Sequence, residues 1–202
     1  MRRITTAYMA LICALVFLVC GCTKGKAMHA EQTSSEQDAV ERSFAQVYTL
    51  RFPAKYSQYA QSGVFATSET ENGQEADGTP YVHKLYADFM PYESLDLIQE
   101  LELMGDEMPE QEYDEKLTAV YDSLRAVFVI TVYDKRQLGD GVDIPSVTGF
   151  ASNILLGEWG DYLCYASTPT RDETGMEKES LTAYRDICGG IQEIFDSIQP
   201  LV

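Results

Sequence analysis

The chain has 202 residues, 45% of them hydrophobic, and its 32 acidic residues outnumber its 15 basic residues to give a formal charge of −17 at pH 7. So acidic a surface repels phosphate groups and anionic lipid head groups, which excludes nucleic acid as a partner. The length and the apolar content suffice for one domain with a hydrophobic core.

The amino terminus has the features of a bacterial lipoprotein signal. Two arginines precede the uncharged run 7–19, whose 13 residues suit a signal core and are short for a membrane-spanning helix of roughly 20 residues. The run ends in Val19-Cys20-Gly21-Cys22, which resembles the lipobox, where the sulfur of the last cysteine receives a diacylglyceryl group. We expect cleavage before Cys22 and stable anchoring through its acyl chains in a membrane of the cell envelope, outside the cytoplasm. An uncleaved amino-terminal anchor is the alternative.

The signal also predicts the domain organisation. Removal of residues 1–21 takes away two arginines and no acid, so the formal charge falls from −17 to −19. Residues 22–42 are rich in Ser, Gln, Lys and Glu, which predicts a flexible tether. Residues 43–202 remain for a single domain.

The first half of this domain contains three predicted strands. Tyr48–Phe52 alternates apolar and polar residues, as a half-buried strand does, and Pro53 ends it. Two further strands are predicted at Gly63–Ser68 and Tyr81–Ala87, with a polar loop at Glu69–Gly78 between them.

Residues 92–124 predict two helices inserted before the next strand. The first begins at Ser94, a good N-cap, and groups Leu97, Leu101 and Met104 on one face. The second begins near Pro109, which suits a first helical turn. Its apolar face is formed by Tyr113, Leu117, Val120, Tyr121 and Leu124.

The segment Glu93–Glu115 carries ten carboxylates and no basic residue. We expect these acids to form an outward surface that binds a cationic partner, and the candidate residues are Glu100, Asp106, Glu107, Glu110, Glu112 and Asp114. A calcium site around Asp106, Glu107 and Glu110 is the alternative. The alternation of Asp and Asn with a fixed Gly that an EF-hand uses is absent. We therefore favour a solvated helical face and expect no metal.

The second half of the domain predicts a central strand, a hairpin and a long helix. Ala126–Tyr133 is apolar on both faces, so we expect it in the middle of a sheet. Gly160-Asp161 fits a two-residue turn between strands at Asn153–Trp159 and Tyr162–Ser167. A helix is predicted at Lys178–Gln199. The residues expected to face the sheet are Leu181, Cys188, Ile191 and Phe195. Gly189-Gly190 inside this helix predicts a bend or a close approach to the sheet.

Three of these segments together resemble the PsbP-like family of α/β/α sandwiches. They are Tyr48–Tyr56, Phe128–Lys135, and Gly160–Pro169 followed by the terminal helix. The resemblance implies an α+β fold with a mostly antiparallel central sheet of about six strands, flanked by helices and covered by a long C-terminal helix. Relative to that fold, residues 92–124 are an insertion. Binding and assembly roles are common in the family, so it implies no particular chemistry.

Few residues have the spacing of a catalytic or metal site. His29 and His83 each lack a second histidine or cysteine at ligand spacing, so we expect no zinc. Cys164 and Cys188 are either a disulfide or two buried thiols. A nucleophile pair of Cys164 with His83 is the alternative to a core thiol and a surface histidine, which we favour.

The sequence therefore favours a lipid-anchored binding or assembly module with no cofactor. The alternative is an extracytoplasmic hydrolase that uses two carboxylates held roughly 5–10 Å apart.

Overall fold

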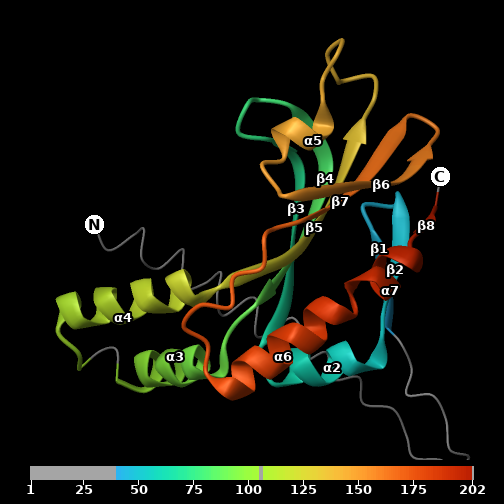
Figure 1. The fold of residues 1–202 in the computed structure, drawn as a ribbon. Coiled ribbons are helices and arrows are strands. Elements are labelled where there is room, and N and C mark those ends of the chain that lie inside the picture. Colours follow the sequence, from blue (N-terminus) through green and yellow to red (C-terminus); the bar gives the residue numbers. More distant parts are fainter. Residues whose placement is uncertain (1–39, 105–106, 202) are drawn as a thin grey trace, which may run out of the picture.

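The computed structural model describes residues 40–104 and 107–201 as an α+β protein (Figure 1). The predicted signal peptide, most of the predicted tether, Cys22, His29 and Asp106 lie outside the described residues. None of the helices within the described ranges has the length and apolar character needed to cross a membrane.

Eight strands and six helices make up the described part of the chain. In chain order they are β1 (Val40–Phe44), β2 (Tyr48–Phe52), α2 (Ala54–Gln61), β3 (Phe65–Gln74), β4 (Pro80–Phe89), α3 (Tyr92–Met104), α4 (Glu110–Ser123), β5 (Arg125–Asp134), α5 (Ile144–Val147), β6 (Ser152–Trp159), β7 (Tyr162–Thr168), α6 (Lys178–Gly189), α7 (Ile191–Asp196) and β8 (Gln199–Pro200).

The strands form two antiparallel sheets. Five strands pair in the order β3-β4-β5-β7-β6, and three pair in the order β1-β2-β8. The α+β class and the antiparallel pairing are confirmed, but the expected single sheet of about six strands is wrong. The reason lies in β2, which pairs with β1 just before it and with β8 from the carboxyl end of the chain. The tight turn at Ala45 and Gln46, both with positive φ, brings β1 back onto β2. β1 begins at Val40, within the predicted tether.

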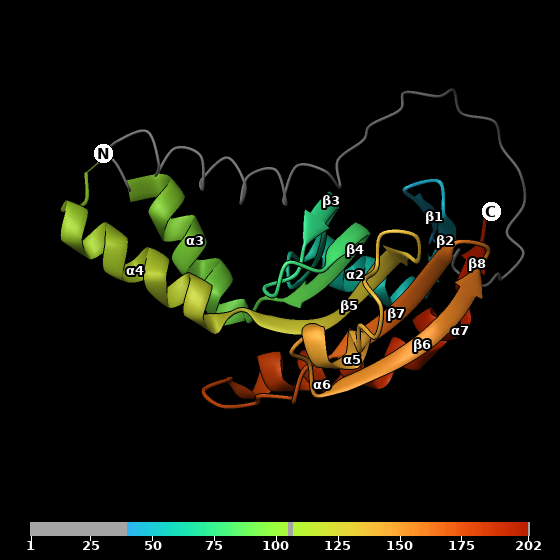
Figure 2. The ribbon, with the colours of Figure 1, turned by 90° about the horizontal axis from the view of Figure 1, so that it is seen from above.

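The core lies on both faces of the five-stranded sheet. β5 is the middle strand, and its residues from Val127 to Asp134 are all buried, as its two apolar faces predict. On one face, Phe128 packs edge-on against Phe195 of α7, with ring centroids 5.4 Å apart. On the other face, Tyr133 forms a smaller buried cluster with Tyr81 and Ile144 of α5. Figures 1 and 2 show α2, α6 and α7 on one side of the sheet and α5 on the other.

The carboxyl-terminal helix is interrupted at Gly190, which confirms the predicted bend at Gly189-Gly190, but it does not run unbroken to Gln199. α6 ends at Gly189 and α7 starts at Ile191, and α7 ends at Asp196 before the short strand β8. A Cβ atom on Gly190 would lie 2.7 Å from the Lys55 side chain and 2.8 Å from the Tyr56 hydroxyl. The close approach is therefore to α2, not to the sheet. Cys188 and Phe195 are buried as expected, whereas Leu181 and Ile191 are only half-buried.

Smaller corrections concern element boundaries. The β6–β7 hairpin with its turn at Gly160 is confirmed, because Trp159 pairs with Tyr162 and Gly160 has a φ of 57°. β3 continues to Gln74 through most of the predicted polar loop, because its exposed edge tolerates polar residues. Helix α2 was not predicted. Ser94 does not cap α3, which begins two residues earlier.

Candidate functional site: an acidic helical hairpin and the hollow at its base

Residues 92–124 form a helical hairpin, built from α3 and α4, that connects the neighbouring antiparallel strands β4 and β5. The hairpin extends beyond the end of the sheet and away from α7 and the three-stranded sheet (Figure 2). Leu101 of α3 and Val120 of α4 are buried, and neither belongs to the two core clusters of the domain. The hairpin therefore contributes little to the core that holds the sheets together.

The base of the hairpin is fastened to the start of α6 through Glu93. Ser180 Oγ donates a hydrogen bond of 2.5 Å to one carboxylate oxygen of Glu93, and the backbone N–H of Glu177 donates one of 3.1 Å to the other. Ser180 Oγ also accepts the backbone N–H of Tyr92 at 2.9 Å. A carboxylate from α3 thus caps α6, where negative charge is stabilising. Burial raises the pKa of Glu93, but the hydrogen bonds from Ser180 and Glu177 outweigh it and lower the pKa overall. Glu93 is therefore not one of the outward acids that we expected.

The opposite side of the base has its own contacts. Ser94 Oγ donates to Ser123 Oγ at 2.7 Å, which joins α3 to the end of α4. Arg125 follows the hairpin and lies 3.4 Å from the carboxylate of Asp172. Both ends of the hairpin are thus held in place at its junction with the domain.

Lys116 neutralises part of the predicted acidic surface. Its Nζ atom lies 2.5 Å from a carboxylate oxygen of Glu100 on α3 and 3.2 Å from one of Glu112 on α4. Lys116 is the residue after Glu115, where the segment without basic residues ends. Its position in the sequence did not indicate which carboxylates it would pair with. Glu100 of α3 therefore joins the two helices through Lys116, and Glu112 pairs with Lys116 within α4.

Other acids of the hairpin remain available. Glu107, Glu110 and Asp114 are exposed and have no ion pair among the described residues. Glu110 and Asp114 also line a shallow hollow on α4 together with Glu115. Asp106, the sixth candidate, lies outside the described residues. The three exposed candidates therefore retain the character of a negative interaction surface.

Two apolar side chains lie near the tip of the hairpin, close to these acids in the sequence. Leu103 is 76% exposed and Met104 is 50% exposed. Met104 does not share the buried face of Leu101, contrary to our prediction. A partner that docks here meets both negative charge and apolar surface.

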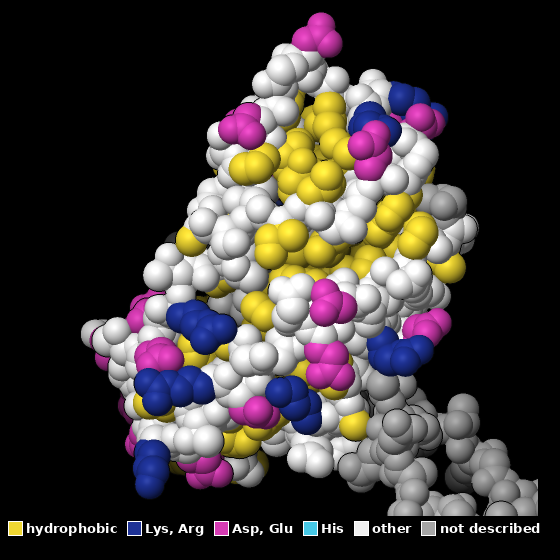
Figure 3. All heavy atoms as spheres, turned by 45° about the vertical axis from the view of Figure 1, so that its right-hand side comes forward, with side chains coloured by type: hydrophobic (Ala, Val, Ile, Leu, Met, Phe, Trp, Pro, Cys, Tyr) yellow, Lys and Arg dark blue, Asp and Glu magenta, His cyan; other side chains and the backbone are white. Residues whose placement is uncertain are grey.

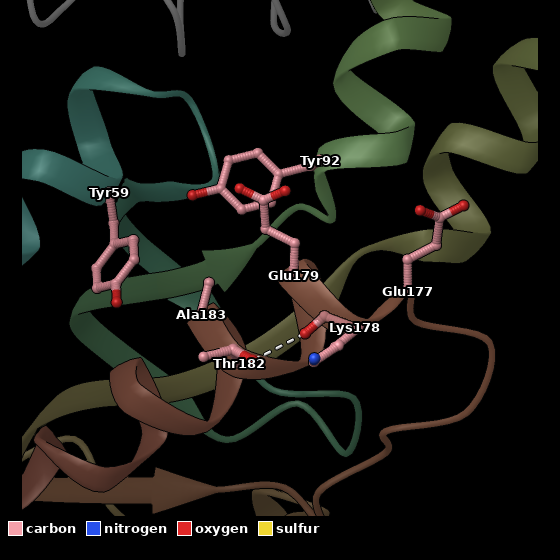
Figure 4. A pocket seen from close by; sticks show the side chains of 7 residues that line it. All are labelled: Tyr59, Tyr92, Glu177, Lys178, Glu179, Thr182 and Ala183. Carbon is pink, nitrogen blue, oxygen red and sulfur yellow. Dashed lines mark hydrogen bonds between the residues drawn. The ribbon is translucent and has the colours of Figure 1, made fainter.

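A second shallow hollow lies at the base of the hairpin, between α2, α3 and α6. It is lined by Tyr59, Tyr92, Glu177, Lys178, Glu179, Thr182 and Ala183. In Figure 4, Tyr59 and Tyr92 come from different helices toward the first turns of α6, and Ala183 lies between the two tyrosines in this view. Sequence patterns did not indicate this hollow, because its residues come from three separate segments and Tyr92 and Glu177 are 85 positions apart.

The described residues provide little support for a metal or nucleophile site. Within the described ranges 40–104 and 107–201, no group of three His, Cys, Asp or Glu side chains is placed to hold a metal ion. Cys164 and Cys188 are buried free thiols. Burial raises the pKa of Cys164 to about 12, so it is protonated at neutral pH.

His83 is buried in the core, so the expected surface histidine is wrong. Its Nε2 atom lies 3.1 Å from Glu69 Oε2, and its Nδ1 atom lies 3.3 Å from the Tyr48 hydroxyl. Val132 pairs with His83 on one side and with Cys164 on the other. The histidine and the thiol are therefore separated by two strand spacings, about 9–10 Å, which is too far for a nucleophile and its base.

A different face of the molecule is apolar. Figure 3 shows hydrophobic side chains gathered in the upper half of the face that carries the β6–β7 hairpin. Ile154 and Leu155 of the edge strand β6 are 43% and 49% exposed. The ladder between β6 and β7 is irregular between Leu155 and Gly157. Such a bulge twists an edge strand and makes pairing with another chain less favourable.

Comparisons with known proteins identify no relative, since no family model, no curated protein and no solved structure matches this chain.

Proposed function

We propose that this protein is a lipid-anchored binding module of the bacterial cell envelope whose helical hairpin recruits a cationic protein partner. The observation that carries the proposal is the set of free carboxylates on an arm that extends away from the core, represented by Glu107, Glu110 and Asp114. Exposed acids on the helical hairpin do not contribute to packing, and they are accessible to an approaching partner.

Electrostatics support this assignment. The whole chain is strongly acidic, so its electrostatic field attracts cations. The free carboxylates of the helical hairpin make that field strongest near one surface. The association rate with a cationic partner should fall steeply as salt screens the charges. Leu103 and Met104 add apolar area near the tip, which gives a docked partner a contact that salt does not weaken.

The location of the protein is part of the same proposal. A lipid on Cys22 would hold the chain at the membrane, and residues 23–39 would allow the domain to reach a neighbouring envelope protein. The PsbP-like resemblance fits this role, because that fold is used for binding and assembly.

The alternative hydrolase is less well supported. It requires two carboxylates that face each other across a cleft. The carboxylates of each described hollow lie on one helix, α4 in one case and the start of α6 in the other. Both hollows are shallow, which suits contact with a macromolecule better than enclosure of a substrate.

The test uses the soluble domain without its signal and an oligolysine peptide as the probe. We compare the wild type with a variant carrying Glu107→Gln, Glu110→Gln and Asp114→Asn. Affinity at about 20 mM salt should fall at least tenfold in this variant, and the slope of log affinity against log salt should become shallower.

A matched control removes the same charge elsewhere. Glu71→Gln, Asp140→Asn and Glu193→Gln neutralise three exposed acids on β3, the loop before α5, and α7. This control should bind within about threefold of the wild type. Equal losses in the two triple variants would mean that only the total charge matters, and the proposal would be wrong.

A further inference from the structure

The hollow at the base of the hairpin is lined by aromatic, apolar and acidic side chains. Tyr59 and Tyr92 are half-buried, Ala183 is buried, and Glu177 and Glu179 are exposed. The hollow thus combines two aromatic rings, an apolar floor and two carboxylates (Figure 4).

This combination suits a positively charged group with an apolar stem. Aromatic faces attract ammonium and guanidinium groups, and the stem of a basic side chain packs on apolar surface while its charged end stays near water. The carboxylates of Glu177 and Glu179 accept no hydrogen bond and form no ion pair among the described residues. Lys178 is the one basic residue in the lining, so the hollow with its two carboxylates carries a net negative charge.

An anion is the competing ligand, because the hollow lies at the first turn of α6, where a helix favours negative charge. That position is already filled by the carboxylate of Glu93, which accepts hydrogen bonds from Ser180 and from the backbone of Glu177. The Tyr59 hydroxyl is also occupied, since it donates to Asp186 at 2.9 Å. The hollow therefore offers its ring surfaces and two free carboxylates, against the single ammonium group of Lys178.

The position of the hollow connects it to the rest of the hairpin. Tyr92, Asp96, Gln99 and Leu103 follow one another at spacings of four, three and four residues, so they lie along one face of α3. Asp96, Gln99 and Leu103 are all exposed. At 1.5 Å per residue this face is about 16 Å long, which an extended segment of about five residues can cover.

We propose that the hollow is a specific subsite for one lysine or arginine side chain of the cationic partner, and that the segment carrying this side chain lies along the exposed face of α3. This inference rests on the proposed function, because it names where the partner's charge is received. The free carboxylates near the tip attract the partner, and the hollow fixes its register.

The experiment titrates the soluble domain with N-acetyl-lysine methylamide and, separately, with its arginine counterpart, and follows the Ala183 methyl resonance by NMR. The uncharged norleucine analogue has nearly the same stem and is the negative probe. At least one basic probe should shift the Ala183 resonance saturably, and the norleucine probe should bind at least threefold more weakly. Equal binding of the norleucine probe would overturn the proposal, because the hollow would then be merely apolar.

Variants identify the groups that act. Tyr92→Leu removes the ring and keeps the backbone N–H that bonds to Ser180. It should weaken binding of the basic probe about three- to fivefold. Glu179→Gln should weaken it by a similar factor, whereas Tyr92→Phe and the exposed control Glu193→Gln should leave it unchanged. A Tyr92→Leu protein that folds normally and binds like the wild type would overturn the proposal.

The two proposals fail in different ways. The Glu107, Glu110 and Asp114 variant should lose oligolysine affinity and still shift the Ala183 resonance with the single-residue probe. If oligolysine binds through these acids while the Ala183 resonance does not respond to any basic probe, the hairpin surface stands and the subsite is wrong.

Discussion

Two ionisable residues of β4 lie in surroundings that the sequence does not indicate. His83 is enclosed between Glu69 and Tyr48 and is a hydrogen-bonded core residue. Asp88 lies on the same strand beside a register shift, and it has neither a hydrogen bond nor an ion pair among the described residues. Burial raises the pKa of Asp88 to about 6. A carboxyl group that is costly to ionise in the folded state makes the stability depend on pH.

The sign of that dependence follows from the two states. An aspartate in an unfolded chain has a pKa of about 3.9, so the unfolded chain ionises first as the pH rises. Asp88 therefore lowers the free energy of unfolding progressively between about pH 4 and pH 6. Asp88→Asn should remove this loss. Between pH 4 and pH 7, the free energy of unfolding of the variant should therefore change more favourably than that of the wild type, by about 1–3 kcal/mol.

Urea unfolding at pH 4, 5, 6 and 7 checks this prediction. The other carboxyl groups titrate alike in both proteins, so their effects cancel in the difference. Asp140→Asn, at an exposed position, is the control and should leave the pH profile unchanged. Parallel profiles for Asp88→Asn and the wild type would show that Asp88 ionises normally.

Phe195 provides a test of packing at the same scale. It is 5% exposed and its ring meets that of Phe128 edge-on. Phe195→Ala should lower the free energy of unfolding by about 3–5 kcal/mol, because it leaves a cavity between α7 and β5. Denaturant unfolding measures the change, and Glu193→Ala on the exposed side of α7 should cost less than about 0.5 kcal/mol. A negligible loss for Phe195→Ala would mean that α7 does not pack on the sheet.

Among the elements, the two helices of the hairpin and the two at the carboxyl end have different roles. α6 and α7 cover the main core, and their break at Gly190 lets the chain approach Lys55 and Tyr56 of α2. The helical hairpin is joined to the domain chiefly at its base, where Glu93 caps α6. Its outer part should therefore be removable without loss of the fold.

We predict that a variant lacking residues 97–120, with Asp96 joined to Tyr121 by a short Gly/Ser linker, folds cooperatively. The linker needs about four residues, because packed helices lie about 8–10 Å apart. The deletion keeps Tyr92–Leu95 and Ser123, and so retains the contacts at the base. Far-ultraviolet circular dichroism and thermal unfolding measure folding.

Binding separates the two roles of the hairpin in the same variant. Because the acidic surface is gone, affinity for oligolysine should fall at least as far as in the triple carboxylate variant. An unfolded deletion variant would make the hairpin part of the structural core. A folded variant with wild-type affinity would place the binding surface elsewhere.

For the molecule as a whole, the lipid anchor on Cys22 is a prediction that the net negative charge makes testable. The acidic chain keeps a distance from anionic head groups, so a lipid rather than surface charge would have to hold it at the membrane. Cys22→Ser should abolish metabolic labelling with radioactive fatty acid and leave unprocessed precursor, which electrophoresis detects as a longer chain. Cys20→Ser, which keeps a small residue at that position, should still be labelled. Labelling that persists in Cys22→Ser would move the lipid to another residue.

Strong local patterns were enough to predict several elements correctly. β5 was predicted from its two apolar faces, β2 from its alternation, and the β6–β7 turn from Gly160-Asp161. Each of these depends on forces within a few residues: side-chain alternation, turn geometry and local burial. The existence and negative charge of the helical hairpin were predictable for the same reason.

Which segments meet could not be predicted from these local patterns. The second sheet required β8 to return from the carboxyl end to β2, and the cap on α6 required Glu93 to arrive from a helix 84 residues earlier than Glu177. The pairing of Lys116 with Glu100, the burial of His83 and the hollow between Tyr59 and Tyr92 are likewise long-range contacts. Periodicity in a sequence reports which face of an element is buried, but it carries no information about which partner covers that face, because any apolar surface of suitable shape can do so.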